Sequence, residues 1–183
     1  MSFKKNIPNL ITILRFPGAV SLLFLDVLSP LYFIVYTATG FTDILDGFLA
    51  RKMNLKSSLG TKLDSAADLL FYSISIMRLL PILIKILPPY IWFIVGAIIL
   101  CRFVSYIISA VRFRKFASHH TLLNKITGVF VFLLPYMLIT PIKAQYCFAV
   151  CIVGILSTVE DLYIHITSKE YSENIISAFT LNQ

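Results

Sequence analysis

Four aspartates in a short apolar part of the chain are the residues best suited to chemistry. The 183-residue sequence holds nine acidic side chains, and four of them are Asp43, Asp46, Asp64 and Asp68. An ionised group in such apolar sequence is costly unless it is paired or binds a cation. The spacings of three and four residues place the members of each pair on one helix face, one turn apart.

This spacing predicts a metal site. If the two helices are neighbours in an antiparallel hairpin, the four carboxylates converge on one pocket, where their mutual repulsion opposes ionisation. One or two hard divalent cations would resolve that conflict. Ligation by carboxylates alone suits magnesium, manganese or calcium, whereas zinc favours nitrogen and sulfur ligands. The sequence therefore predicts a carboxylate-bound hard cation.

Small and basic residues beside the aspartates fit a phosphate-bearing ligand. Gly47 and Ala50 leave one face of the first helix without bulk, so a flat ligand could lie against the backbone. Arg51 offers a planar charged fork suited to phosphate, and Gly60 opens the second helix or lets it pack closely. In the alternative interpretation, the acids only form surface pairs with neighbouring basic residues, which are Arg51, Lys52, Lys56 and Lys62.

The residues resemble a known family signature. The pattern Asp-x2-Asp-Gly-x2-Ala-Arg-x8-Gly-x3-Asp-x3-Asp is that of the CDP-alcohol phosphotransferases, which are integral membrane enzymes of phospholipid synthesis. The chain matches it at eight positions within 26 residues, without a departure: Asp43, Asp46, Gly47, Ala50, Arg51, Gly60, Asp64 and Asp68.

The resemblance implies a transferase that moves a phosphatidyl-type group from a CDP-linked lipid to a small alcohol and releases CMP. It implies two Mg²⁺ or Mn²⁺ ions held by Asp43, Asp46 and Asp64 with help from Asp68, which also takes the proton of the attacking hydroxyl. Residues of the same motif would bind the CDP-lipid: Gly47, Ala50, Arg51 and Gly60. A homodimer is a further expectation carried over from the family.

Composition predicts an all-α integral membrane protein. Hydrophobic residues make up 58% of the chain, charged residues only 14%, and the mean hydropathy is +0.85, far from a soluble domain. Because a membrane span needs about 20 apolar residues, residues 1–183 form a single domain with six transmembrane helices, a short cytoplasmic N-terminal segment and a C-terminal tail. The predicted spans are 9–28, 31–52, 60–87, 90–113, 122–139 and 144–166.

Basic residues predict the orientation. With a cytoplasmic amino terminus, the inner segments hold eleven basic residues and the outer loops only Lys85 and Lys143. Both termini and all four motif aspartates then face the cytoplasm in a multi-pass cell-membrane protein. The net charge of +7 belongs mostly to this inner collar, where it attracts anionic membrane lipids; it does not indicate nucleic-acid binding.

Two further groups are candidates for binding the acceptor alcohol. Asn9, Thr12 and Arg15 share one face of the first span, in a stretch that resembles the opening of the phosphatidylglycerophosphate synthase branch, so glycerol 3-phosphate is the first choice. Lys125, near a helix amino terminus, makes a plausible anion site. Related enzymes often carry Gly-Lys-x-Lys-Thr there, whereas this chain has only one of the two lysines.

Several alternatives stay open from the sequence. The acceptor could instead be inositol phosphate, serine or phosphatidylglycerol. An intramembrane prenyltransferase also uses aspartates and magnesium, although such enzymes need more spans and two separated motifs. A divalent-cation transporter would explain the acids but not Gly47, Ala50 and Arg51. Arg102 lies near the middle of its span, where a partner for its charge is expected, and Glu160 or Asp161 is available.

Overall fold

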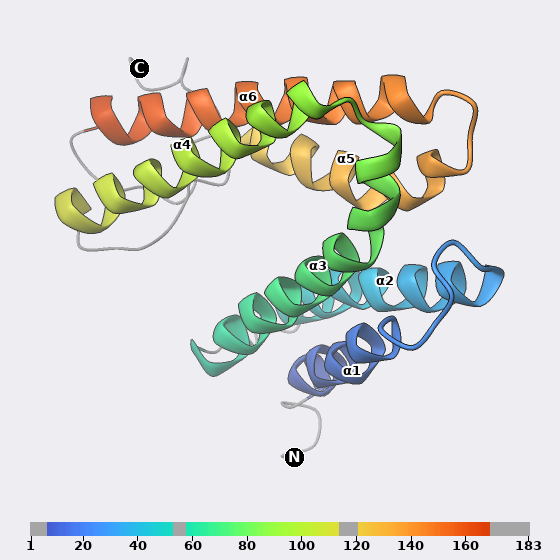
Figure 1. The fold of residues 1–183 in the computed structure, drawn as a ribbon. Helices are drawn as coiled ribbons and strands as arrows, with labels where there is room; N and C mark the ends of the chain where they lie inside the picture. Colours follow the sequence, from blue (N-terminus) through green and yellow to red (C-terminus); the bar gives the residue numbers. More distant parts are fainter. Residues whose placement is uncertain (1–6, 53–57, 114–120, 169–183) are drawn as a thin grey trace. The chain divides into compact units, whose positions relative to one another are not determined.

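The computed structural model describes residues 7–52, 58–113 and 121–168, and the regular structure in these ranges is entirely α-helical (Figure 1). This confirms the predicted all-helical class. The helices are α1 (Ile7–Ser21), α2 (Pro30–Lys52), α3 (Ser58–Ile86), α4 (Pro89–Phe113), α5 (Leu122–Leu138) and α6 (Lys143–Thr167).

Five of the six predicted segments match these helices to within two residues at either end. The α3 helix stops at Ile86, and α4 begins at Pro89, the first position of a helix, where the N–H that proline lacks would have no partner within the helix. Thr121 caps α5, since its hydroxyl oxygen accepts a hydrogen bond from the backbone N–H of Asn124 at 3.2 Å. Local signals in the sequence therefore mark the starts of α4 and α5.

The prediction that the first span continues to residue 28 is wrong, because α1 ends at Ser21. The next three backbone N–H groups bond to carbonyls three residues earlier, as in a tighter turn. The Ser21 hydroxyl also donates to the carbonyl of Gly18 at 2.7 Å, and Leu28 has a φ of +64°. The apolar run of residues 22–25 thus forms a turn.

Three helical segments are long and apolar enough to cross a membrane: Lys62–Ile86, Pro89–Phe113 and Lys143–Thr167. Two shorter apolar segments, Leu10–Ser21 and Leu122–Leu138, accompany them. The 17 residues of α5 extend about 26 Å at the usual rise, slightly less than a hydrocarbon core of about 30 Å. Length and composition in the described ranges therefore indicate a membrane protein, and the number of spans stays a prediction.

The chain divides into two compact units, Met1–Leu83 and Ile84–Gln183. In the first unit, α1 packs against α2 at Gly18, where an added Cβ would lie 2.5 Å from the Thr39 hydroxyl oxygen. Such a distance leaves no room for any side chain at position 18. One turn before Gly18, Arg15 meets Thr42, which lies one turn after Thr39, so the two helices run antiparallel.

Aromatic rings set the register between α2 and α3. Tyr32 stacks on Tyr36 with ring centroids 5.8 Å apart, and Tyr36 packs against Phe71 of α3 at 5.0 Å. All three rings are almost fully buried. Asp43 lies seven residues after Tyr36, and Asp64 lies seven residues before Phe71. In an antiparallel pair, equal steps in opposite directions keep the two aspartates opposite each other.

In the second unit, α6 packs against both α4 and α5. Six polar side chains line these contacts and are called the polar seam: Arg102, Ser105, Asn124, Ser157, Asp161 and His165. Arg102 donates to Asn124 Oδ1 at 2.7 Å and to Ser157 Oγ at 2.9 Å. The expected pairing of Arg102 with an acid of α6 is therefore replaced by neutral partners.

Asp161 of the polar seam has partners of its own. Ser105 Oγ donates to Asp161 Oδ2 at 2.9 Å and lies 3.0 Å from His165 Nδ1. His165 Nδ1 is also 2.8 Å from the carbonyl oxygen of Asp161, a distance that requires the proton on Nδ1. All three side chains are at most 2% exposed, so these contacts join α4 to α6 inside the unit.

Candidate metal and catalytic site

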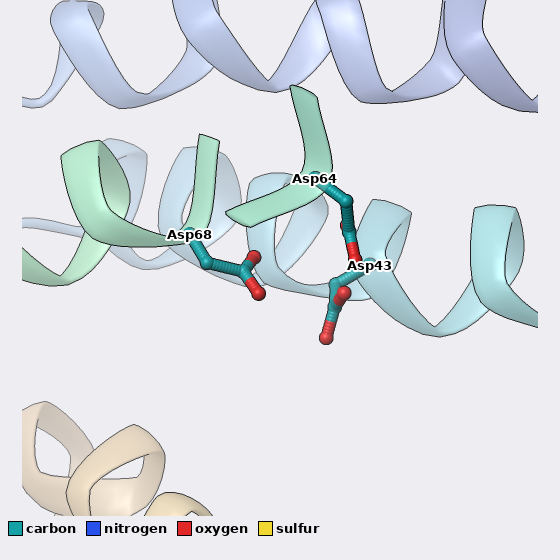
Figure 2. Close-up of side chains that lie close together, drawn as sticks. All are labelled: Asp43, Asp64 and Asp68. Atoms are coloured by element: carbon teal, nitrogen blue, oxygen red, sulfur yellow. The ribbon is translucent and has the colours of Figure 1, made fainter. Parts of the chain in front are cut away.

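Three of the four motif aspartates meet in the first unit. Asp43 comes from α2, and Asp64 and Asp68 come from successive turns of α3 (Figure 2). One carboxylate oxygen of each lies within 4.8 Å of those of the other two. The predicted convergence of the two helices is therefore confirmed for these residues, which are called the acid cluster. The side chain of Asp46 lies outside the described residues.

The acid cluster is open to ligands. The side chains of Asp43, Asp64 and Asp68 are 49%, 43% and 37% exposed. Three negative charges at this separation repel one another, and the repulsion is stronger beside apolar helices than in bulk water. An arrangement of this kind therefore needs positive charge.

Arg15 of α1 supplies such a charge. Its Nη1 donates to Asp64 Oδ1 at 3.0 Å and to Asp68 Oδ1 at 2.5 Å, and its Nη2 lies 3.3 Å from Asp43 Oδ1. Its Nε donates to the hydroxyl oxygen of Thr42 at 3.4 Å. The arginine side chain is only 1% exposed. One buried guanidinium thus contacts all three carboxylates of the acid cluster.

The geometry of the acid cluster fits a hard divalent cation. Oxygens bind Mg²⁺ or Ca²⁺ at about 2.0–2.6 Å, so three oxygens within 4.8 Å of one another can reach a single ion. The cluster offers only carboxylate oxygens, the ligands that magnesium, manganese and calcium prefer. Its half-exposed side chains also leave a path for entry. These residues could hold a metal ion.

The remaining predicted site residues are placed as follows. Gly60 lies in the first turn of α3. Thr12 is buried one turn before Arg15, and Lys125 is exposed near the start of α5, in the second unit. The structure does not describe the side-chain surroundings of five others: Asn9, Asp46, Gly47, Ala50 and Arg51.

The sequence interpretation missed the link between Arg15 and the acid cluster. Arg15 was grouped with Asn9 and Thr12 by its helical spacing, yet its acidic partners lie up to 53 residues away in the sequence. Thr42, which orients the guanidinium, was also missed. One signal was available, because an arginine inside an apolar helix is expected to face a charged partner or a wet cavity.

Comparison with known proteins agrees with this site. The sequence model described as CDP-alcohol phosphatidyltransferase matches residues 5–161, a range that contains α1 to α5, most of α6 and the whole acid cluster. No solved structure matches the chain significantly.

Several curated proteins are similar to parts of the chain. The CDP-diacylglycerol--glycerol-3-phosphate 3-phosphatidyltransferase of Aquifex aeolicus is 31% identical over 132 residues, which cover 69% of this chain and 71% of that protein. Proteins of the same name from Rickettsia bellii and Rickettsia prowazekii are 36% and 35% identical over 85 residues. Those matches cover 44% and 43% of this chain, and 47% of either relative.

The family model covers far more than half of the chain, and the helices assemble three of the four aspartates of the motif on which the resemblance rests. A carboxylate cluster able to hold a divalent cation, with two of its residues on the long apolar helix α3, suits phosphoryl transfer on a membrane lipid. The chain therefore belongs to the CDP-alcohol phosphatidyltransferase family, whose members are membrane-bound transferases of phospholipid biosynthesis.

Proposed function

We propose that this protein transfers the phosphatidyl group of CDP-diacylglycerol to glycerol 3-phosphate and releases CMP. The observation that carries the proposal is the acid cluster, held by the antiparallel register of α2 and α3 in a chain of this family. The choice of acceptor is supported by three relatives whose names specify glycerol 3-phosphate. An acceptor hydroxyl oxygen forms the new bond to the lipid-side phosphorus, and the bond from that phosphorus to CMP breaks.

The proposed cofactor is a pair of Mg²⁺ or Mn²⁺ ions bound by Asp43, Asp46, Asp64 and Asp68. When bound, such ions neutralise negative charge that develops on the phosphoryl oxygens and on the departing CMP. The protein contributes ligands fixed before substrate arrives, since the Tyr36–Phe71 contact sets the register of α2 and α3, and the Gly18–Thr39 approach sets α1 against α2. Preorganised ligands need little rearrangement during the reaction.

Asp68 is the proposed general base for the acceptor hydroxyl. It follows Asp64 by one helical turn in α3, and its side chain is 37% exposed. A base must come within hydrogen-bond reach of the proton that it removes, and this exposure leaves room for a hydroxyl beside the carboxylate. Gly47, Ala50, Arg51 and Gly60 are the proposed contacts of the cytidine and its phosphates, as the family motif implies.

Lys125 is the leading candidate for the phosphate of the acceptor. Its side chain is exposed in the first turn of α5, where Thr121 caps the helix. A helix amino terminus and a lysine together favour an anion. Asn9, Thr12 and Arg15 remain proposed contributors, although Thr12 is only 3% exposed and the guanidinium of Arg15 contacts the acid cluster.

In the proposed membrane arrangement, all six helices span the bilayer and both termini face the cytoplasm, together with the active site. Labelling of single cysteines introduced at position 2 and beside Lys143 tests this topology, because only the second should react from the outside.

A homodimer is also proposed on the family resemblance. Crosslinking in membranes tests the dimer.

The function is tested with purified protein, CDP-diacylglycerol and a panel of alcohols, with CMP release as the readout. We expect turnover with glycerol 3-phosphate in Mg²⁺ or Mn²⁺, and none in a chelator. Turnover with serine, an inositol phosphate or phosphatidylglycerol alone would reject the acceptor but keep the transferase. Full turnover in the chelator would reject the metal site.

A further inference from the structure

Arg15 contacts one oxygen of each carboxylate that a metal ion would need. Its Nη1 donates hydrogen bonds to both Asp64 Oδ1 and Asp68 Oδ1, and its Nη2 faces Asp43 Oδ1. A cation that binds all three carboxylates would interact with the same three groups, whose ligand oxygens lie within 4.8 Å of one another. Two positive groups that share one set of ligands repel each other.

The arginine and the carboxylates differ in exposure. Arg15 is 1% exposed, while each aspartate keeps more than a third of its side chain exposed. Thr42 holds the arginine from α2, and its own hydroxyl donates to the carbonyl of Thr39 at 2.5 Å. The guanidinium is therefore fixed on the protein side of the acid cluster, and a cation would approach from the exposed side.

We propose that Arg15 is a built-in counter-ion, which holds the acid cluster together in the metal-free protein and competes with the divalent cation for it. This inference rests on the proposed metal site. Without an ion, three carboxylates would repel one another and push α2 away from α3. With Arg15 present, the ligands stay assembled, and the ion must weaken the contacts of Arg15 as it binds. Arg15 is thus a positioning residue that sets metal affinity.

The decisive variant is Arg15→Gln, which removes the charge and keeps most of the side-chain length. Thermal unfolding of purified protein is measured in chelator and in saturating Mn²⁺. We expect a large fall in Tm in chelator and a clearly smaller fall in Mn²⁺, because the ion replaces the missing charge. The rise in Tm caused by Mn²⁺ is then larger in the variant than in the natural protein.

Metal affinity gives a second, independent readout. Free Mn²⁺ measured by electron paramagnetic resonance should show binding about tenfold tighter in Arg15→Gln, a coupling within the usual range between two sites. Arg15→Lys, which keeps the charge, should remain close to the natural protein in both measurements. Should Arg15→Gln be too unstable to purify in chelator, Arg15→Gln combined with Asp43→Asn should restore stability there, because one repelling charge is gone.

Two results would overturn the proposal. Equal loss of Tm with and without Mn²⁺, at unchanged affinity, would leave Arg15 a structural residue only. Weaker Mn²⁺ binding in Arg15→Gln would mean that the arginine assists the ion. A wrong assignment of the metal site would give a different result from a wrong role for Arg15. In that case the natural protein and Asp64→Asn would bind Mn²⁺ with the same affinity.

Discussion

In the first unit, three carboxylates share one guanidinium, whereas in the second unit the charged members of the polar seam contact mostly neutral groups. Each aspartate of the acid cluster is more than a third exposed. Asp161 and His165 of the polar seam are almost fully buried, and the Ser105 hydroxyl contacts both of them. Arg102 bonds to an amide and a hydroxyl.

This difference separates a site from a structural contact. The acid cluster carries an excess of negative charge that solvent can reach, so it is suited to bind and release a cation. Polar groups that satisfy one another inside a helix contact mainly fix which helices pair, at a modest gain of free energy. The Ser105, His165 and Asp161 side chains contain the residue types of a hydrolase triad, but His165 Nδ1 faces both Ser105 and the Asp161 carbonyl, so their arrangement indicates structure.

The largest expected effect is on the acid cluster. Asp43→Asn, Asp64→Asn and Asp68→Asn should each lower kcat/KM by about a thousandfold or more, since metal ligation supplies several kcal/mol of transition-state stabilisation. CMP release measures the loss. The control is Asp26→Asn, which changes an exposed acid of the turn between α1 and α2 and should keep full activity. Near-normal turnover in Asp64→Asn would place the chemistry elsewhere.

The next effect concerns the acceptor. Lys125→Ala should raise the KM for glycerol 3-phosphate by about 10- to 150-fold, equal to the roughly 1.5–3 kcal/mol of a charged hydrogen bond. The KM for CDP-diacylglycerol should change much less. Lys143→Ala, an exposed lysine at the start of α6, serves as the matched control. An unchanged acceptor KM in Lys125→Ala would remove this residue from the phosphate site.

A smaller effect is expected where α1 meets α2. Gly18→Ala should destabilise the protein by about 1–3 kcal/mol, the usual penalty for overpacking, because the new Cβ would lie 2.5 Å from the Thr39 hydroxyl oxygen. Gly96→Ala is the control in α4, since nothing lies within 4 Å of its added Cβ. Chemical unfolding in detergent compares the two. Equal stability of both variants would contradict the close approach of α1 and α2.

The smallest effect should be in the polar seam. Ser105→Ala should cost about 0.6–1.7 kcal/mol of stability, as for other polar contacts between membrane helices, and activity per folded molecule should stay unchanged. Ser73→Ala, at an exposed position of α3, should change neither. A loss of turnover in Ser105→Ala without a loss of stability would make the seam part of the chemistry and erase the contrast between the two units.

The sequence predicted most helix ends because apolar runs and their polar borders are local features, and Pro89 and Thr121 mark the starts of α4 and α5. Aspartate spacing likewise predicted the convergence of Asp43 with Asp64 and Asp68. Two features were not predicted from the sequence. The end of α1 at Ser21 depends on side-chain and backbone bonds that hydropathy does not reveal. The partners of Arg15 depend on how three helices pack, and no local pattern encodes a contact across 49 or 53 residues.

The register of α2 and α3 also predicts where the chain tolerates length changes. Asp43 is tied to the Tyr36 contact and Asp64 to the Phe71 contact by seven-residue steps of helix. One residue inserted within either step would turn its aspartate by about 100° around the helix and dismantle the acid cluster. The same insertion in the turn between α1 and α2 leaves both steps intact. Insertions and deletions among relatives should therefore be absent from 36–43 and 64–71 and occur in that turn.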